Sequence, residues 1–369
     1  MNRNQVTNLV RKRIEEGLYP RGLLLPPERL MAEELGTSRP TLRRALEPLV
    51  KEGLLEAQPG RGTLVVDAAS LEARQPWRVV AILLPGIGNP FFMEVAEAIE
   101  YAALQRGYQI LLCNSRGMPH LEELHIQQLV RRRVDGVILA HPPHQEMSSA
   151  MTLLKEESIP TVSLFSSARE ADCDSVILDD RAGVEQALRY LHSLGHRRIA
   201  FCRPLPDATP HPREAHFTEF MAKMSGENEA SVFSIHGDKE HEVLATLRGL
   251  FQRENRPTAC LAGNDNIALL LMRHLAAIEV SVPKDVSIVG FDNLRYVEYL
   301  PVPLTTVDQP KQEMGRRAAE LLFERIEMGP GAPPQLHVFT PHLVIRESCT
   351  VCQEAPVSRR PRSNLSRTV

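Results

Sequence analysis

The sequence lacks a long apolar run, an excess of charge of one sign and a secretion signal. Its length of 369 residues predicts two to three domains. No stretch approaches the roughly 20 uncharged apolar residues that a membrane-spanning helix needs, and the amino terminus leads into a charged amphipathic segment. The formal net charge of -3 means that any basic surface has to be local. We therefore expect a cytoplasmic protein that does not contact a membrane.

Motifs of cofactor and metal chemistry are also missing. No G-x-G-x-x-G fingerprint follows a predicted strand and no P-loop is present, so nucleotide binding has no support. The 6 cysteines are scattered, and several lie in apolar runs, as small buried residues do. Cys349 and Cys352 form an isolated C-x-x-C pair, which lacks the further ligands of a zinc site. We expect no cofactor, no metal and no catalytic residues.

Residues 1–68 have the pattern of a small helical domain that ends in a hairpin. Apolar residues recur at helical spacing in three segments, residues 6–18, 28–35 and 39–52. Gly36 favours a left-handed cap after the second helix, and Ser38 is placed to cap the third, with Pro40 in its first turn. Two short strands flank a turn at residues 59–62. This order predicts a winged helix-turn-helix.

The predicted third helix begins with residue types that suit DNA, although scattered arginines also occur on solvated helix faces. In the major groove, arginine can hold guanine O6 and N7 with two hydrogen bonds. This part of the chain resembles the DNA-binding head of the GntR family in the segments LPPERL, AEELGTSRPTLRRAL, EGLL and GRGT. It departs from that family at Pro27, usually Ser or Ala, and at Pro40, usually Thr, so the operator preference is expected to differ. The expected DNA contacts are Arg29, Ser38, Arg39, Thr41, Arg43, Arg44, Gly60 and Arg61.

From residue 78 onward, strand and helix patterns alternate. Apolar runs at residues 79–84 and 136–139 are separated by helical segments such as residues 121–132. Such alternation predicts an α/β domain with a parallel sheet and helices on both faces. Residues 69–77, which are polar and rich in alanine, are interpreted as a linker.

The large domain resembles the effector domain of the LacI/GalR family of sugar-responsive repressors. The shared motifs are NPFF at 89–92, VDGVI at 134–138, LGHRRIAF at 194–201, VPKDVSIVGFDN at 282–293 and PLTTV at 303–307. The resemblance implies an effector-binding domain over residues 78–348, built as two Rossmann-like lobes like a periplasmic binding protein. The expected parts are lobe one at 78–164 and 293–322, lobe two at 165–292 and 323–347, and a disordered, arginine-containing tail at 349–369.

Polar candidates for effector contacts lie at predicted strand ends and helix starts. Asp292 follows a buried parallel strand, and ligands bind at the carboxyl ends of such strands in open α/β sheets. An aspartate that caps a turn is the alternative. Asn264 offers amide donors and acceptors, whereas Asp265 is expected to cap the helix that starts at Ile267.

Further candidates follow from the resemblance. Arg213 fits the R-x-x-G-F arginine of the family, which donates paired hydrogen bonds to ligand oxygens, although His216 stands in place of the glycine. Phe91 and Phe92 could stack on the apolar face of a sugar or anchor the first helix in the core. The expected effector contacts are Phe91, Phe92, Arg213, Asn264 and Asp292.

These features together predict a dimeric transcription regulator, most simply a repressor. Each head would read half of a roughly palindromic operator, and a small ligand, expected to be a sugar, would bind between the lobes. The arrangement resembles chimeric regulators of the arabinose-repressor type; a transcription activator or a regulator that responds to a non-sugar metabolite is the alternative. GntR heads also occur on aminotransferase-like enzymes, but no lysine of the large domain has such a context. A transport binding protein would need a signal peptide and no DNA-binding head.

Overall fold

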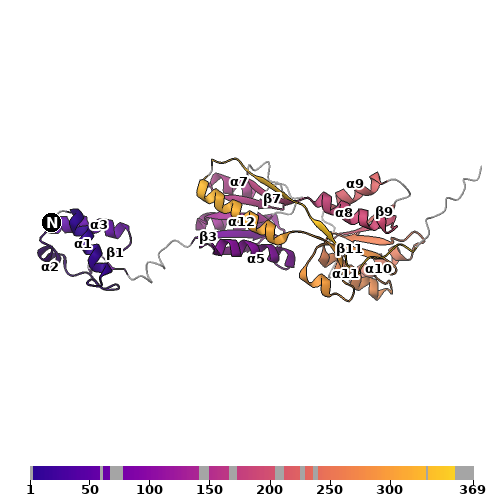
Figure 1. Ribbon diagram of the computed structural model, residues 1–369, viewed down its shortest axis with the longest axis horizontal. Helices are drawn as coiled ribbons and strands as arrows, with labels where there is room; N and C mark the ends of the chain where they lie inside the picture. Colours follow the sequence, from indigo (N-terminus) through magenta and orange to yellow (C-terminus); the bar gives the residue numbers. More distant parts are fainter. Residues whose placement is uncertain are drawn as a thin grey trace, which may run out of the picture. The chain divides into compact units, whose positions relative to one another are not determined.

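The protein divides into two compact units, Met1–Trp77 and Arg78–Val369 (Figure 1). The computed structural model describes residues 3–58, 61–66, 78–140, 149–165, 173–203, 212–224, 229–235, 240–329 and 331–353. Within these residues, no helix is both long and apolar enough to cross a membrane. The expected linker at 69–77 lies outside them.

The first unit is a winged helix-turn-helix, as predicted. Its elements are α1 (Arg3–Glu15), α2 (Glu28–Glu34), α3 (Arg39–Lys51), β1 (Leu55–Gln58) and β2 (Gly62–Val65). The strands form an antiparallel hairpin in which Leu55 pairs with Val65. Fully buried side chains from all three helices, among them Val10, Met31 and Leu42, form the core that orients α3. The helical spacing of the apolar residues therefore predicts both where the helices lie and which of their faces are buried.

The first lobe of the large unit is built on an entirely parallel sheet. Its strands, in spatial order, are β13 (Leu336–Phe339), β7 (Asp174–Leu178), β6 (Thr161–Leu164), β5 (Gly136–Ala140), β3 (Val79–Leu84) and β4 (Gln109–Asn114). Its helices are α5 (Pro90–Leu104), α6 (Pro119–Arg132), α7 (Ser149–Glu156) and α12 (Lys311–Met328). The central strands β3 and β5 are almost wholly buried, because helices cover both faces of such a sheet.

The second lobe repeats this architecture with one antiparallel edge strand. Its strands, in spatial order, are β14 (His342–Val344), β12 (Thr305–Asp308), β11 (Ser287–Asp292), β10 (Ala259–Ala262), β8 (Arg198–Arg203) and β9 (Glu229–Ser234). Its helices are α8 (Asp180–Ser193), α9 (Pro212–Lys223), α10 (Glu240–Phe251), α11 (Asp265–Ala277) and the 3-10 helix η2 (Arg295–Tyr299). The chain passes between the two sheets after β7, after β12 and after β13, so the expected two-lobed fold is confirmed (Figure 1).

The expected lobe boundaries are wrong at these crossings. β7, which the expected boundaries place in lobe two, pairs in parallel with β6 of lobe one, and β13 pairs with β7 in the same sheet. β12, which the expected boundaries place in lobe one, pairs in parallel with β11 of lobe two. Buried parallel strands of either sheet have the same apolar pattern, so this pattern does not indicate which sheet a strand joins.

The expectation of a disordered tail is wrong for its first residues, 349–352, which are hydrogen-bonded to lobe two. Cys349 donates its thiol hydrogen bond to the carbonyl of Ile288 at 3.2 Å, and the amide of Thr350 donates to Oγ of Ser287 at 3.0 Å. The amide of Cys352 donates to the carbonyl of Leu194 at 2.8 Å. These bonds join residues 349–352 to lobe two, whereas the arginines of the tail lie outside the described residues.

The close contact of α12 with α5 leads to a stability prediction. A Cβ at Gly315 would lie 2.6 Å from the carbonyl oxygen of Val95 and 2.9 Å from Cβ of Ala98, so Gly315→Ala would force the helices apart. We expect a loss of about 1–3 kcal/mol in unfolding free energy. The same change at Gly249 in α10, where the new Cβ would meet no atom within 4 Å, is expected to stabilise the protein by up to ~1 kcal/mol. Thermal unfolding of both variants checks this, and equal shifts of the same sign would contradict it.

Candidate functional site

The start of α3 is a capped helix end with a basic surface. Oγ of Ser38 accepts a hydrogen bond from the amide of Thr41 at 3.3 Å and lies 2.8 Å from Oγ1 of Thr41. Ser38 is thus the N-cap that the sequence predicts. The hydroxyls of Ser38 and Thr41 are hydrogen-bonded to each other. A bound phosphate or base would therefore have to compete with this hydrogen bond or add to it.

Arginines line a concave surface at this helix start. A hollow of about 540 Å³ is lined by Arg39, Pro40, Arg43 and Arg44. The side chains of Arg39 and Arg43 are 59% and 64% exposed, respectively. Arg29 on α2 and Arg61 at the hairpin are also exposed, whereas Gly60 lies outside the described residues. The structure therefore brings Arg39, Arg43 and Arg44 together as one cationic surface.

One acidic residue, which the sequence reasoning missed, lies within this cationic surface. Glu28 accepts hydrogen bonds from Nε of Arg43 at 2.9 Å on both carboxylate oxygens. Its Oε2 also lies 3.6 Å from Nη2 of Arg39. The hydrogen bond from Arg43 holds the pKa of Glu28 below its ordinary value. The motif L-P-P-E-R-L contains this residue, but no spacing rule relates it to an arginine on the next helix.

In the large unit, a buried carboxylate lies at the carboxyl end of β11. Asp292 is 3% exposed; its Oδ1 accepts a hydrogen bond of 2.5 Å from Nε2 of Gln309 and lies 3.8 Å from Nη1 of Arg213. Its φ of 121° and that of Asn293, 51°, lie in the left-handed region. Such strain in non-glycine residues concentrates at functional sites. Burial raises the pKa of Asp292, and the cation of Arg213 opposes this shift.

Arg213 connects several strand ends and helix starts of lobe two. Its Nε donates to Oδ1 of Asp180 at 2.7 Å, and its Nη1 donates to the carbonyl of Gly263 at 2.8 Å. The guanidinium carbon lies 3.6 Å from the ring centroid of Phe291, which is a cation–π contact. His216 lies in the same regular helix α9, so the departure from the glycine of the family does not disrupt the backbone there.

Asn264, and not Asp265 as expected, caps α11. Oδ1 of Asn264 accepts from the amide of Ile267 at 2.9 Å and caps α11, so the expected cap at Asp265 is wrong. Asp265 is fully buried and accepts from Oγ1 of Thr306 at 2.6 Å and from the amide of Leu294 at 2.8 Å. A buried carboxylate requires such donors. Both residue types can cap a helix, and the donors to Asp265 from Thr306 on β12 and from Leu294, just before η2, hold this carboxylate away from the cap position.

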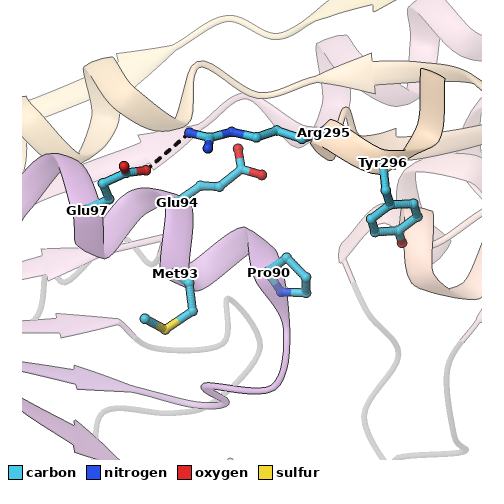
Figure 2. Close-up of a pocket in the computed structure, with 6 residues that line it drawn as sticks. All are labelled: Pro90, Met93, Glu94, Glu97, Arg295 and Tyr296. Atoms are coloured by element: carbon cyan, nitrogen blue, oxygen red, sulfur yellow. Dashed lines mark hydrogen bonds and ion pairs between the residues drawn. The ribbon is translucent and has the colours of Figure 1, made fainter. Parts of the chain in front are cut away.

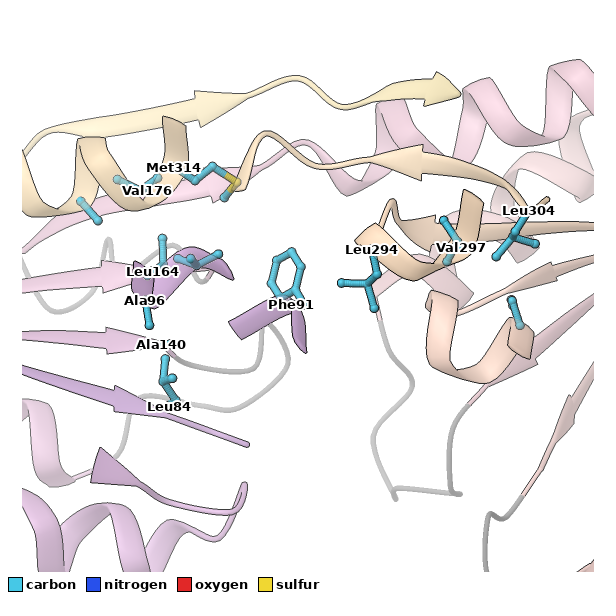
Figure 3. Close-up of a cluster of buried hydrophobic side chains, with 14 of the residues drawn as sticks. Leu84, Phe91, Ala96, Ala140, Leu164, Val176, Leu294, Val297, Leu304 and Met314 are labelled. Atoms are coloured by element: carbon cyan, nitrogen blue, oxygen red, sulfur yellow. The ribbon is translucent and has the colours of Figure 1, made fainter. Parts of the chain in front are cut away.

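Three aromatic rings meet where β6 ends and α5 begins. Phe91 lies 5.3 Å from Phe92 and 5.2 Å from Phe165, centroid to centroid, and Phe92 lies 5.8 Å from Phe165. Phe91 is 6% exposed and lies between the buried residues of lobe one and Leu294 of lobe two (Figure 3). The core-anchor interpretation therefore describes Phe91, while Phe92 and Phe165 are half-buried. The sequence reasoning missed Phe165, because it belongs to no motif.

Polar contacts join the two lobes beside this cluster. Nδ2 of Asn266 in lobe two donates to Oδ1 of Asn89 in lobe one at 3.0 Å, and within lobe two the hydroxyl of Tyr296 donates to Oδ1 of Asn266 at 2.8 Å. Nη2 of Arg295 donates to Oε2 of Glu97 at 3.1 Å. Figure 2 shows this pair among the residues that line a pocket. The pocket has a volume of about 480 Å³. The residues that line the pocket are Pro90, Met93, Glu94, Glu97, Arg295 and Tyr296.

A winged helix-turn-helix with a cationic α3, joined in one chain to a two-lobed α/β domain, defines a class of ligand-responsive DNA-binding regulators. Comparison with protein families agrees with both parts. Residues 2–65 match the gntR family of bacterial regulatory proteins, and residues 188–349 match the periplasmic binding protein-like domain.

The similar proteins and solved structures include transcription repressors and regulators. The ribose operon repressor of Escherichia coli (strain K12) is 30% identical over 286 residues, 76% of this chain and 84% of that protein. The arabinose metabolism transcriptional repressor of Geobacillus stearothermophilus is 29% identical over 341 residues, 88% of this chain and 91% of that protein. A LacI family transcriptional regulator from Enterococcus faecium, solved with bound ribose, has a TM-score of 0.62 and 27% identity, over 74% of this chain and 100% of that chain. The chain therefore belongs to the LacI family of transcription regulators and is a DNA-binding regulator of the repressor type.

Proposed function

We propose that the chain is a chimeric repressor, in which a GntR-type head binds an operator and a LacI-type sensor domain binds a sugar. The observation that carries the sensor assignment is the paired charge of Asp292 and Arg213 at the carboxyl ends of lobe-two strands. A carboxylate accepts hydrogen bonds from sugar hydroxyls, and a guanidinium donates to sugar oxygens. Phe92 and Phe165 add aromatic surface for the apolar face of a sugar ring. The relative from Enterococcus faecium was solved with ribose, which supports a pentose as the first ligand to test.

Lobe closure would connect the ligand to the DNA. The contacts of Asn89 with Asn266 and of Glu97 with Arg295 join the lobes, so a ligand that changes their closure changes these contacts as well. A complete switch from 1:99 to 99:1 between two closure states needs about 5.5 kcal/mol of differential binding. Several charge-assisted hydrogen bonds, each worth roughly 1.5–3 kcal/mol, can supply this difference.

The regulator would act as a homodimer, with one head for each half-site of a roughly palindromic operator. Exposed apolar side chains on lobe one support self-association. Tyr101 and Leu104 on α5 are 65% and 57% exposed, and Leu112 on β4 is 41% exposed. Exposed apolar side chains that gather into one patch are typical of a protein interface.

Binding to duplexes drawn from upstream of its own gene and of neighbouring genes tests this function. Fluorescence anisotropy at fixed salt, with and without a panel of pentoses, hexoses and disaccharides, should show tight binding that one sugar changes. Binding that no sugar changes would remove the sugar assignment and leave the operator assignment intact. Binding without any sequence preference would overturn the proposed role of the head.

A further inference from the structure

Glu28 is an acidic residue in a surface that the proposed function gives to DNA. It is the first residue of α2, its side chain is 31% exposed, and it faces the arginines at the start of α3. A carboxylate near a phosphate backbone repels it, so its presence in this surface requires an explanation. A structural role is available, because an acidic residue in the first turn of a helix interacts favourably with the helix dipole. That role does not account for the geometry of its contact with Arg43.

The contact engages one particular edge of the guanidinium. Nε of Arg43 lies 2.9 Å from both oxygens of Glu28, and Nη2 lies 2.9 Å from Oε2. This is the side edge of the group, formed by Nε and Nη2. The planar guanidinium has a second, end-on edge formed by its two terminal nitrogens. The pair with Glu28 does not use Nη1, so this second edge can meet a base while the first stays bound to the carboxylate.

Arginine reads guanine through two parallel hydrogen bonds to O6 and N7, and one guanidinium edge is sufficient for them. A long exposed side chain without a restraint has to be ordered at the moment of binding, which weakens the specific complex. A carboxylate that already holds Arg43 removes part of that cost. It also neutralises one positive charge, which weakens binding to phosphates of any sequence.

We infer that Glu28 is a positioning residue for base recognition. Through its forked contact with the side edge of Arg43, it aims the end edge of the guanidinium at a guanine and reduces the affinity for unrelated DNA. This inference rests on the proposed function, in which the head binds operator DNA. In this role Glu28 increases the specificity of DNA binding. Neutralising Glu28 is therefore expected to increase the affinity for nonspecific DNA.

The test compares Glu28→Gln with Glu33→Gln in the full-length protein. Glu33 lies on the same helix, is exposed and, within the described residues, has no ion pair with an arginine of α3. Glu33→Gln therefore makes the same change of net charge without removing a contact to the recognition helix α3. The probes are a duplex selected by the wild type from a random-sequence library and a scrambled duplex of equal composition. Anisotropy titrations over a series of KCl concentrations give both affinities and their salt dependence.

For Glu28→Gln we expect tighter binding to the scrambled duplex, with a slope of log K against log[salt] that is steeper by about 0.9 for each cation released to phosphate. The preference for the selected duplex should fall about tenfold. Glu33→Gln should keep the wild-type preference. In an Arg43→Lys background, which keeps the charge but lacks the fork, Glu28→Gln should cause no further loss of preference.

The outcomes separate this role from the function on which it rests. A wild type that prefers no selected duplex would overturn the proposed function and the role of Glu28 together. A wild-type preference that Glu28→Gln retains would overturn the role of Glu28 alone. A lower thermal midpoint of Glu28→Gln with unchanged preference would likewise reduce Glu28 to a helix-stabilising residue.

Discussion

Asp292→Asn is expected to weaken effector binding by about tenfold or more, while the affinity for operator DNA without effector stays at the wild-type value. Asparagine has the shape of aspartate but no charge, so the sugar hydroxyls lose a charge-assisted acceptor, which is worth roughly 1.5–3 kcal/mol. The variant also removes the anion that faces Arg213 at 3.8 Å. Titration of the effector by calorimetry gives the affinity, and anisotropy gives the DNA binding.

The matched control lies before the amino end of the same strand. Oδ2 of Asp285 accepts a hydrogen bond of 2.8 Å from the amide of Ser281, remote from the carboxyl-end crevice of the sheet. Asp285→Asn can keep that bond and should leave the effector affinity unchanged. Equal effects of the two variants would contradict the assignment of the site to the carboxyl end of β11.

The same carboxylate predicts a pH dependence. If the ionised form of Asp292 accepts the hydroxyls, effector affinity falls as the pH decreases through its pKa and the group takes up a proton. Because burial raises this pKa, the fall begins at a higher pH than for an exposed aspartate. Arg213, Lys311, Asp265 and Gln309 also act on the group, and the cations among them oppose the shift. In Asp292→Asn this part of the pH dependence should disappear.

The local sequence pattern was sufficient to predict the helices and strands and the structural roles of several individual residues. The apolar period predicted α1 and α3, and the residue types at Ser38 predicted its cap. The glycine after a β-branched run placed Asp292 at the end of a buried strand, and the structure agrees. These features depend on residues within one or two turns of each other, so a single sequence contains the information.

Features that join distant segments could not be predicted in this way. Glu28 is 15 residues from Arg43, and Asp292 is 17 residues from Gln309. No periodicity relates such pairs, because the fold determines which elements face each other. The sequence did not predict that β12 belongs to the second sheet for the same reason, because this membership depends on its pairing with β11, a separate segment of the chain. The resemblance to known families supplied the two-lobed fold, which the alternating pattern alone does not specify.

Arg43→Ala is expected to have the largest effect on DNA binding, a loss of at least about a hundredfold in specific affinity. A bidentate arginine contact contributes about 1–3 kcal/mol of discrimination, and a dimer would lose one in each head. The substitution also leaves the Glu28 carboxylate without its bidentate partner, so an uncompensated anion faces the DNA. The preference for the selected duplex should fall together with the affinity, since this residue is expected to read a base.

Arg11→Ala is the matched control for this prediction. Arg11 lies on α1 of the same unit and also forms an ion pair with a glutamate, at 2.6 Å between its Nη2 and Oε2 of Glu52. Its loss changes the net charge equally but removes no residue of α3. Anisotropy at fixed salt should therefore show near wild-type preference for Arg11→Ala and a loss for Arg43→Ala. Equal, modest losses in both variants would mean that the arginines of α3 act only through their charge, and that bases are read elsewhere in the head.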